Sequence, residues 1–334
     1  MKFNLETAIL YIIKKKDFRK NFAIICFFLL LYLLFGVIRS YFASYMYFDG
    51  AEEKMSLAVM NFTPNNIYSF IGFPSVASFL AAFDICRLAW GEFEIYGIIA
   101  SGVVVVSGLI LSFPVGYFIY NSHNRILYKE QNLVSADSFS DCFKKGLFAI
   151  LGCIINSVPV LIIAILTCKL FFGYFDRLII DNPDLVWLYT QMRTTASYII
   201  LCVCAFVMFL YLSAAILPYI VDLKLSSFFK LKCIFGIIFK NPLEYLKYIG
   251  FSVLFNGIFA CLIVVLNCIF NVFKELMPFS FNGVEGLIYG DDLFLLLLSI
   301  VLILISLPFA FFLFSIVSDI QAQFINYLTK KNDR

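Results

Sequence analysis

Residues 133–159, LVSADSFSDCFKKGLFAILGCIINSVP, decide the fold class, because they show how this chain of 334 residues meets a membrane. The first half of the stretch is polar and basic and carries a helix-start signal. The second half opens an apolar run of the length that crosses a bilayer, which takes about 20 residues. The same arrangement of a polar segment followed by an apolar run recurs along the chain. The stretch therefore predicts a helical membrane protein.

The composition of the whole chain supports this class. Hydrophobic residues make up 62% of the chain and charged residues 14%, which is far from the averages of soluble domains. We expect an all-α fold, a polytopic transmembrane helical bundle of about six spans that contacts the lipid bilayer throughout. The expected spans are residues 21–42, 96–120, 146–170, 196–220, 248–272 and 293–316. The net charge of +3 is small, so nothing indicates a nucleic-acid partner.

Three segments lie outside these spans. Residues 43–94 are predicted to form an insertion on the outer face, in which residues 67–83 form a re-entrant or surface helical pair, or else a seventh crossing. Residues 171–195 are predicted to be a polar loop with a turn at Asn182-Pro183-Asp184. Residues 6–13 suggest a short amphipathic helix on the inner surface.

Residues 224–240 predict a basic amphipathic helix on the cytoplasmic side. Its expected apolar face consists of Phe228, Leu231, Phe235 and Ile238. Asn241, Pro242 and Glu244 then form a helix-start pattern, with a capping Asn, a Pro at the first helical position and a Glu at the third. The fifth span should therefore begin inside the cytoplasm.

The placement of basic residues predicts the orientation. With six spans, the two termini and the even-numbered links hold 18 of the 25 Lys and Arg residues. The three opposite loops hold 13 acidic residues. Because cytoplasmic loops of membrane proteins are enriched in Lys and Arg, we expect a multi-pass protein of the cytoplasmic (inner) membrane with both termini in the cytoplasm.

The same map contains an internal repeat. Each unit has a cytoplasmic amphipathic segment, an outgoing span, an acidic outer loop and a returning span with a proline near its inner half. These prolines, which are candidate helix-breaking residues, are Pro114, Pro218 and Pro308. A threefold duplication and a set of six similar hairpin helices both fit this pattern.

The order of several short motifs carries a family resemblance. The motifs are Gly116-Tyr117, Asn121, Arg125, Leu133, Asp137, Phe139, Phe143, Gly146-Leu147 and Pro159, then Pro218, Phe228, Asn241-Pro242, Tyr245-Leu246 and the closing segment from Asp319 to Gln323. In this order the chain resembles an uncharacterised bacterial and archaeal membrane-protein family of unknown function. It is also similar in layout to the membrane domain of some glycerophosphodiesterases, without their catalytic domain. Val134 and Ala136 stand where the family tends to have Pro and Trp. The resemblance implies a fold but no activity.

The sequence contains no catalytic motif that we can identify. His123 is the only histidine, which excludes zinc sites built from several His, and we interpret it as a solvated surface residue. The patterns GxxxxGK[ST], GxGxxG and GxSxG do not occur. We therefore predict no catalytic residue, no cofactor and no metal site.

Amide and hydroxyl side chains are the polar groups expected at membrane depth. The candidates are Asn156, Ser157, Asn256 and Asn267. They would serve as hydrogen-bond partners between helices or, alternatively, line a substrate site. Asn256 and Asn267 are eleven residues apart, about three helical turns, and should share a face.

Three functions follow from these features. The first is a non-enzymatic membrane scaffold or accessory subunit that binds lipid, a membrane partner complex or a second copy of itself. The second is a transporter or permease-like subunit, with proline-broken spans around a midplane lined by Asn156 and Asn256. The third is an intramembrane enzyme acting on lipid, with either Asp84 and Arg87 or Asp137 and Asp141 as the polar groups near the interface. Ser138 and Asp141 better fit a capping box.

Overall fold

The computed structural model of the chain describes residues 18–44, 95–128, 139–181, 185–276 and 290–332. Several sequence predictions fall outside these residues. They are the helix at 6–13, nearly all of the 43–94 insertion with its re-entrant segment at 67–83, the turn at 182–184, and the side chains of Asp137 and Ser138.

The described residues form seven α-helices and one 3₁₀ helix, with no strand among them. The elements are α2 (Phe18–Ser44), α6 (Ile95–Tyr128), α7 (Phe139–Asp181), α8 (Val186–Asp222), η2 (Leu225–Phe229), α9 (Leu231–Lys240), α10 (Pro242–Leu276) and α11 (Gly290–Asn332). The predicted all-α class is therefore confirmed.

Four of the described helices are long and apolar enough to cross a membrane. The qualifying segments are Val105–Ile126, Phe139–Leu178, Cys202–Asp222 and Ile300–Lys331. They belong to α6, α7, α8 and α11, and they support the assignment to membrane proteins. The other two expected spans, residues 21–42 and 248–272, each lie within one helix, α2 and α10. The total of six stays a prediction.

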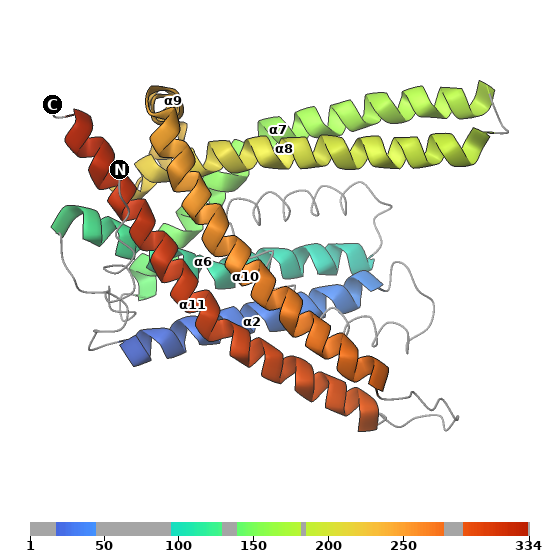
Figure 1. Cartoon of the computed structure of the whole chain (residues 1–334), viewed down its shortest axis with the longest axis horizontal. Coiled ribbons are helices and arrows are strands. Elements are labelled where there is room, and N and C mark those ends of the chain that lie inside the picture. Colours follow the sequence, from blue (N-terminus) through green and yellow to red (C-terminus); the bar gives the residue numbers. More distant parts are fainter. Residues whose placement is uncertain (1–17, 45–94, 129–138, 182–184, 277–289, 333–334) are drawn as a thin grey trace.

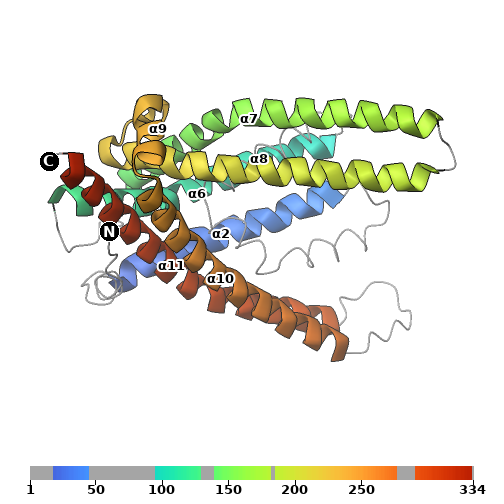
Figure 2. The same ribbon diagram turned by 45° about the horizontal axis from the view of Figure 1, so that its top comes forward.

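Consecutive long helices pack together in pairs (Figure 1). α2 packs along α6, α7 along α8, and α10 along α11, each pair running antiparallel. α6 is central, because it also packs against α7, α11 and α8. The outgoing helices α2, α7 and α10 begin near the same end of the molecule, and the returning helices finish there (Figure 2). We call this the packed end.

The hydrophobic core is concentrated at the packed end. Nine consecutive residues of α8, 212–220, are buried. The largest buried side chains there include Phe113 and Tyr117 of α6 and Phe311 and Phe324 of α11. Away from this end, the α7/α8 pair and the α10/α11 pair diverge in both views (Figures 1 and 2). The helices are thus held together mainly at one end.

The prediction of a polar loop over residues 171–195 is wrong. α7 continues to Asp181 and α8 begins at Val186. One ion pair joins the two helices in this segment: Arg193 of α8 contacts Asp176 of α7 at 2.7 Å and lies 5.5 Å from the centre of the Phe172 ring. Both helices therefore extend about 10 residues past the predicted spans.

The single helix expected over residues 224–240 is wrong, and its expected apolar face is divided: Leu231 and Phe235 share an exposed side of α9, whereas Ile238 is partly buried against the core. The segment divides at Lys230 into η2 and α9, and this break changes which side chains point inward. Phe228 is buried, but Leu231 and Phe235 are exposed, and Ile234 and Ile237 are the inward-facing residues of α9.

The predicted helix start at Asn241-Pro242 is confirmed. α10 begins at Pro242 with Glu244 in its first turn. The backbone N–H of Tyr245 donates to the Asn241 carbonyl at 2.9 Å. The side-chain oxygen of Asn241 accepts a hydrogen bond from Lys331 of α11.

Candidate functional site

Two glycines set the distance between α6 and α7. A Cβ atom added to Gly116 would lie 1.7 Å from the Cys142 carbonyl oxygen, and one added to Gly146 would lie 1.6 Å from the Ser112 carbonyl oxygen. Only glycine permits this approach of two backbones, which is a common device between membrane helices. The contact fixes the C-terminal third of α6, where the polar residues of the packed end begin.

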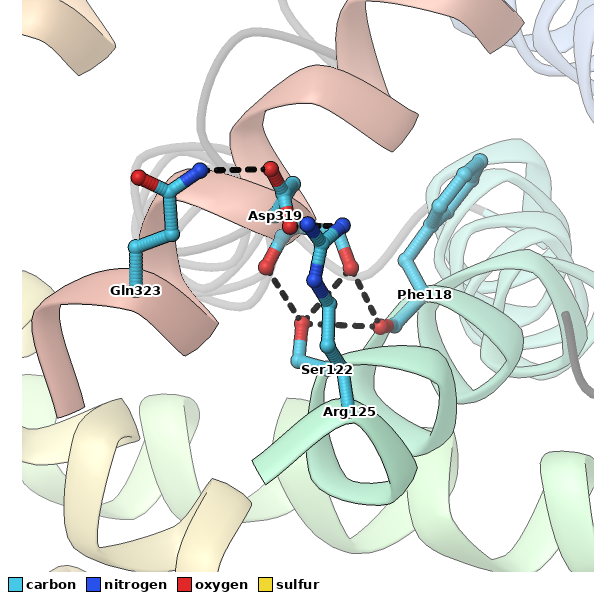
Figure 3. A network of polar contacts seen from close by, with 6 residues as sticks. Phe118, Ser122, Arg125, Asp319 and Gln323 are labelled. Carbon is cyan, nitrogen blue, oxygen red and sulfur yellow. Dashed lines mark hydrogen bonds and ion pairs between the residues drawn. The ribbon is translucent and has the colours of Figure 1, made fainter. Parts of the chain in front are cut away.

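Serine hydroxyls join α6 to α11 (Figure 3). The Ser122 and Ser318 hydroxyl oxygens are 2.6 Å apart. Ser318 donates to the Phe118 carbonyl of α6 at 3.0 Å, and Ser122 lies 3.0 Å from the Ser318 carbonyl. Both serines are buried, so these bonds satisfy hydroxyl groups that would otherwise be desolvated without compensation.

An ion pair lies beside these serines on the same two helices (Figure 3). Arg125 of α6 contacts the carboxylate of Asp319 of α11, and the side chains are 18% and 1% exposed. The other carboxylate oxygen accepts a hydrogen bond from Gln323 at 2.8 Å. A buried carboxylate is tolerated when it is paired and hydrogen-bonded. We take this cluster of buried charged and hydroxyl groups as the candidate site among the described residues.

The C-terminal end of α8 is capped by side chains from neighbouring helices. His123 Nδ1 of α6 lies 2.7 Å from the Ile220 carbonyl oxygen, so the ring carries its proton on Nδ1. Lys145 of α7 donates to the Leu223 carbonyl at 3.5 Å. Leu223 itself has a left-handed backbone with φ of 52° and donates its N–H to Tyr219. Such contacts supply partners for carbonyls that a helix end leaves open.

The position of His123 differs from the sequence interpretation. Its ring is half-buried rather than solvated, stacks on Tyr120 and bonds to α8. No repeated motif marks this role, because the partner is a backbone carbonyl 97 residues away in the chain.

A second charged contact connects α8 to η2. Asp222 accepts a 2.7 Å hydrogen bond from Ser227 and pairs with Lys230. The bond to Asp222 raises the pKa of Lys230 above its ordinary value. Phe228 is fully buried, with its ring against Gly152 and 4.9 Å from the Tyr219 ring. These contacts anchor the segment that leads into α9.

Three of the four predicted polar residues at membrane depth form hydrogen bonds to carbonyls of their own helices. Asn156 bonds the Gly152 carbonyl of its own helix and accepts a 3.0 Å bond from Tyr211 of α8. Ser157 and Asn256 bond carbonyls four residues earlier in their own helices. Asn267 lies in α10, but its side chain is outside the described set. Among the described residues, no hydrogen bond joins Asn156 to Asn256.

The three predicted helix-breaking prolines lie inside continuous helices. Pro114, Pro218 and Pro308 are within α6, α8 and α11, which extend on both sides of them. Each proline removes one backbone N–H. None of the three helices is interrupted at its proline.

Of the acidic residues proposed for lipid chemistry, only Asp141 lies among the described residues. Asp141 is exposed in the first turn of α7, and Arg125 pairs with Asp319 instead. Among the described side chains, no group of three or more His, Cys, Asp or Glu could hold a metal ion. Sequence reasoning noted Arg125 and Asp319 separately and missed their pairing; covariation between the two positions is the signal that could reveal it.

Comparisons with protein families, curated proteins and solved structures found no match to this chain.

Proposed function

We propose that this chain is a non-enzymatic scaffold or accessory subunit of a membrane, which holds a partner against the α7/α8 hairpin. One observation carries the proposal: beyond the packed end, this hairpin presents large apolar side chains on both of its helices. They include Ile155, Val158, Ile162, Ile163, Leu166 and Leu170 of α7 and Ile199, Val203, Phe206 and Val207 of α8, each more than 40% exposed.

The polar groups of the packed end support a scaffolding role. The Arg125–Asp319 pair, the two serines and His123 all bond other helices. Groups engaged in this way stabilise a fixed arrangement, whereas a catalytic site needs groups that can contact a substrate. The diverging hairpins would then offer two apolar surfaces to a membrane partner or a second copy.

The proposed topology has six spans arranged as three hairpin repeats, with both termini in the cytoplasm of a prokaryotic cell. It places the packed end on the cytoplasmic side of the inner membrane. Lys144, Lys224, Lys232, Lys240 and Lys330 are all exposed at or next to this end, in keeping with the enrichment of cytoplasmic loops in basic residues. Membership of the resembling family stays a prediction.

Photo-crosslinking in native membranes tests the proposal. Benzoylphenylalanine replaces Ile163 or Phe206, which are 59% and 61% exposed, and the control position is Lys224, which is exposed at the packed end. We expect the hairpin positions, and not Lys224, to yield one adduct of defined mass. An adduct with another membrane protein indicates an accessory subunit, and one with a second copy indicates a self-assembling scaffold. Adducts with lipid alone would contradict a partner on this face.

The two alternative functions have less support. A transporter site would bring Asn156 and Asn256 together, and each has its own bonds within α7/α8 or within α10. A lipid-modifying enzyme would need reactive groups around Asp141, which is exposed at the start of α7. Neither alternative has an observation that favours it over the scaffold.

A further inference from the structure

α9 runs in a different direction from the long helices. It is seen almost end-on in Figure 1, where α7 and α8 lie across the page, and it remains steeply inclined to them in Figure 2. It lies at the packed end, between η2 and the start of α10. If the long helices cross a bilayer, α9 lies along the membrane surface.

α9 has two apolar faces. The first consists of Ile234 and Ile237, which are buried against the rest of the molecule. The second consists of Leu231, Phe235 and Phe239, which are spaced four residues apart and are 51%, 45% and 72% exposed. Side chains with this spacing follow one side of a helix. Three large apolar side chains in a row are unfavourable in water.

Lysines border this second face. Lys232 and Lys240 are exposed, and neither forms an ion pair with a described residue. Lys230, in contrast, is already paired with Asp222. An apolar stripe with cationic groups along its edge is the pattern of helices that lie in a membrane interface.

The exposed apolar surface continues into α10. Leu243 and Leu246 in its first turns are 65% and 58% exposed, and Val253 and Leu254 follow with 48% and 54%. Leu243, Leu246 and Val253 are three and seven residues apart, and Leu254 is eleven residues after Leu243, so all four follow one side of α10. The start of that stripe directly succeeds α9 in the chain, and its continuation lies in the expected fifth span. An apolar surface therefore leads from α9 towards the depth of the bilayer.

We propose that α9 is a binding site for anionic phospholipid at the packed end. Leu231, Phe235 and Phe239 enter the acyl-chain boundary, and the Lys232 and Lys240 ammonium groups contact the headgroup phosphates. The ligand is anionic because the two lysines are the charged groups along this edge that no described carboxylate neutralises. This site is separate from the α7/α8 hairpin and does not depend on the proposed partner.

Fluorescence quenching by brominated lipid tests the site in the purified full-length chain. The reporter is Phe239→Trp in a chain whose two native tryptophans are replaced, Trp90→Phe and Trp187→Phe. The protein is reconstituted in nanodiscs of phosphatidylcholine and phosphatidylglycerol, in which either one lipid or the other carries bromine. Leu243→Trp provides a second reporter if the first variant folds poorly.

If lipids were distributed at random, quenching would follow the mole fraction of the brominated lipid. We expect brominated phosphatidylglycerol to quench several-fold more than this, since each lysine near an anionic surface favours binding about fivefold. Lys232→Gln with Lys240→Gln should remove this preference while quenching persists. Lys169→Gln removes an exposed lysine of α7, away from α9. This change should leave the preference for phosphatidylglycerol unchanged.

Two results would overturn the proposal. Absence of quenching by either lipid would place the Phe239 face in water or against a protein. Quenching by each lipid in proportion to its mole fraction would show that the Phe239 face contacts lipid but does not select anionic headgroups. Because no partner protein is present, either failure leaves the crosslinking test of the hairpin unaffected.

Discussion

The absence of a side chain at Gly146 allows α6 and α7 to pack backbone against backbone. Gly146→Ala places a Cβ atom where the Ser112 carbonyl oxygen would be 1.6 Å away, so the two backbones must move apart. We expect a loss of at least about 2 kcal/mol in stability, since overpacking of a close contact costs on the order of 1–3 kcal/mol. Unfolding in a mixed-micelle titration measures the loss.

Other glycines in the same helices serve as controls. Gly108 of α6 and Gly173 of α7 have open space where a Cβ atom would stand. Their replacement by Ala should leave stability unchanged or raise it slightly, because Ala favours the helix. If Gly146→Ala were as stable as Gly173→Ala, the close crossing of α6 and α7 would be incorrect.

The Arg125–Asp319 pair should show strong coupling. Arg125→Met or Asp319→Leu leaves one charge among buried groups, and we expect a loss of about 3–5 kcal/mol for each single change. The double variant should lose less than either single variant, because it removes both charges. A double-mutant cycle in the same titration measures this coupling.

The exposed pair of Arg193 and Asp176 is the matched comparison. Its side chains are 34% and 54% exposed, and such pairs contribute about 0–1 kcal/mol. Arg193→Met and Asp176→Leu should therefore show little coupling. Additive losses at Arg125 and Asp319 would show that the two charges do not interact.

At the scale of elements, η2 depends on one side chain. Phe228 is fully buried between Gly152 and Tyr219, and removing such a ring costs about 3–5 kcal/mol. Phe228→Ala should therefore release the segment before α9, and trypsin should cleave at Lys224 and Lys230 faster. Phe229→Ala, at a neighbouring position that is 49% exposed, should leave the cleavage rate unchanged. Equal rates in the two variants would argue against this anchor.

The elements themselves were predictable from sequence to different degrees. The apolar runs predicted where long helices lie, and the Asn241-Pro242 pattern predicted the start of α10. The loop at 171–195 was predicted wrongly because its charges were counted as solvated, whereas Arg193 pairs with Asp176 across the hairpin. The facing of α9 was missed because nothing local in the sequence indicates the break at Lys230.

At the scale of the whole molecule, cysteine labelling tests the proposed orientation. In a cysteine-free chain, Trp187→Cys or Ile180→Cys places a thiol at a site that is 74% or 77% exposed. An impermeant maleimide should label these sites in intact cells, while Lys224→Cys should react only after the membrane is opened. Labelling of Lys224→Cys in intact cells would contradict the proposed orientation.

The overall arrangement was less predictable than the helices. Pairing of α7 with α8 follows from the short connection between these antiparallel neighbours, but the position of α6 at the centre does not follow from any connection. That position depends on the backbone contact at Gly116 and Gly146 and on bonds such as Ser122 to Ser318, which are 196 residues apart. Contacts between such distant residues have no periodicity that one sequence can display. The candidate cluster was therefore visible only as separate residues.

The pairing of Arg125 with Asp319 also orders events during synthesis. α6 is translated before α11, so the guanidinium group of Arg125 has to wait for its carboxylate until α11 has been translated. A nascent chain that stalls before α11 lacks Asp319 and keeps an uncompensated charge where the finished protein has a buried ion pair. Stable packing of the C-terminal end of α6 therefore depends on the arrival of α11.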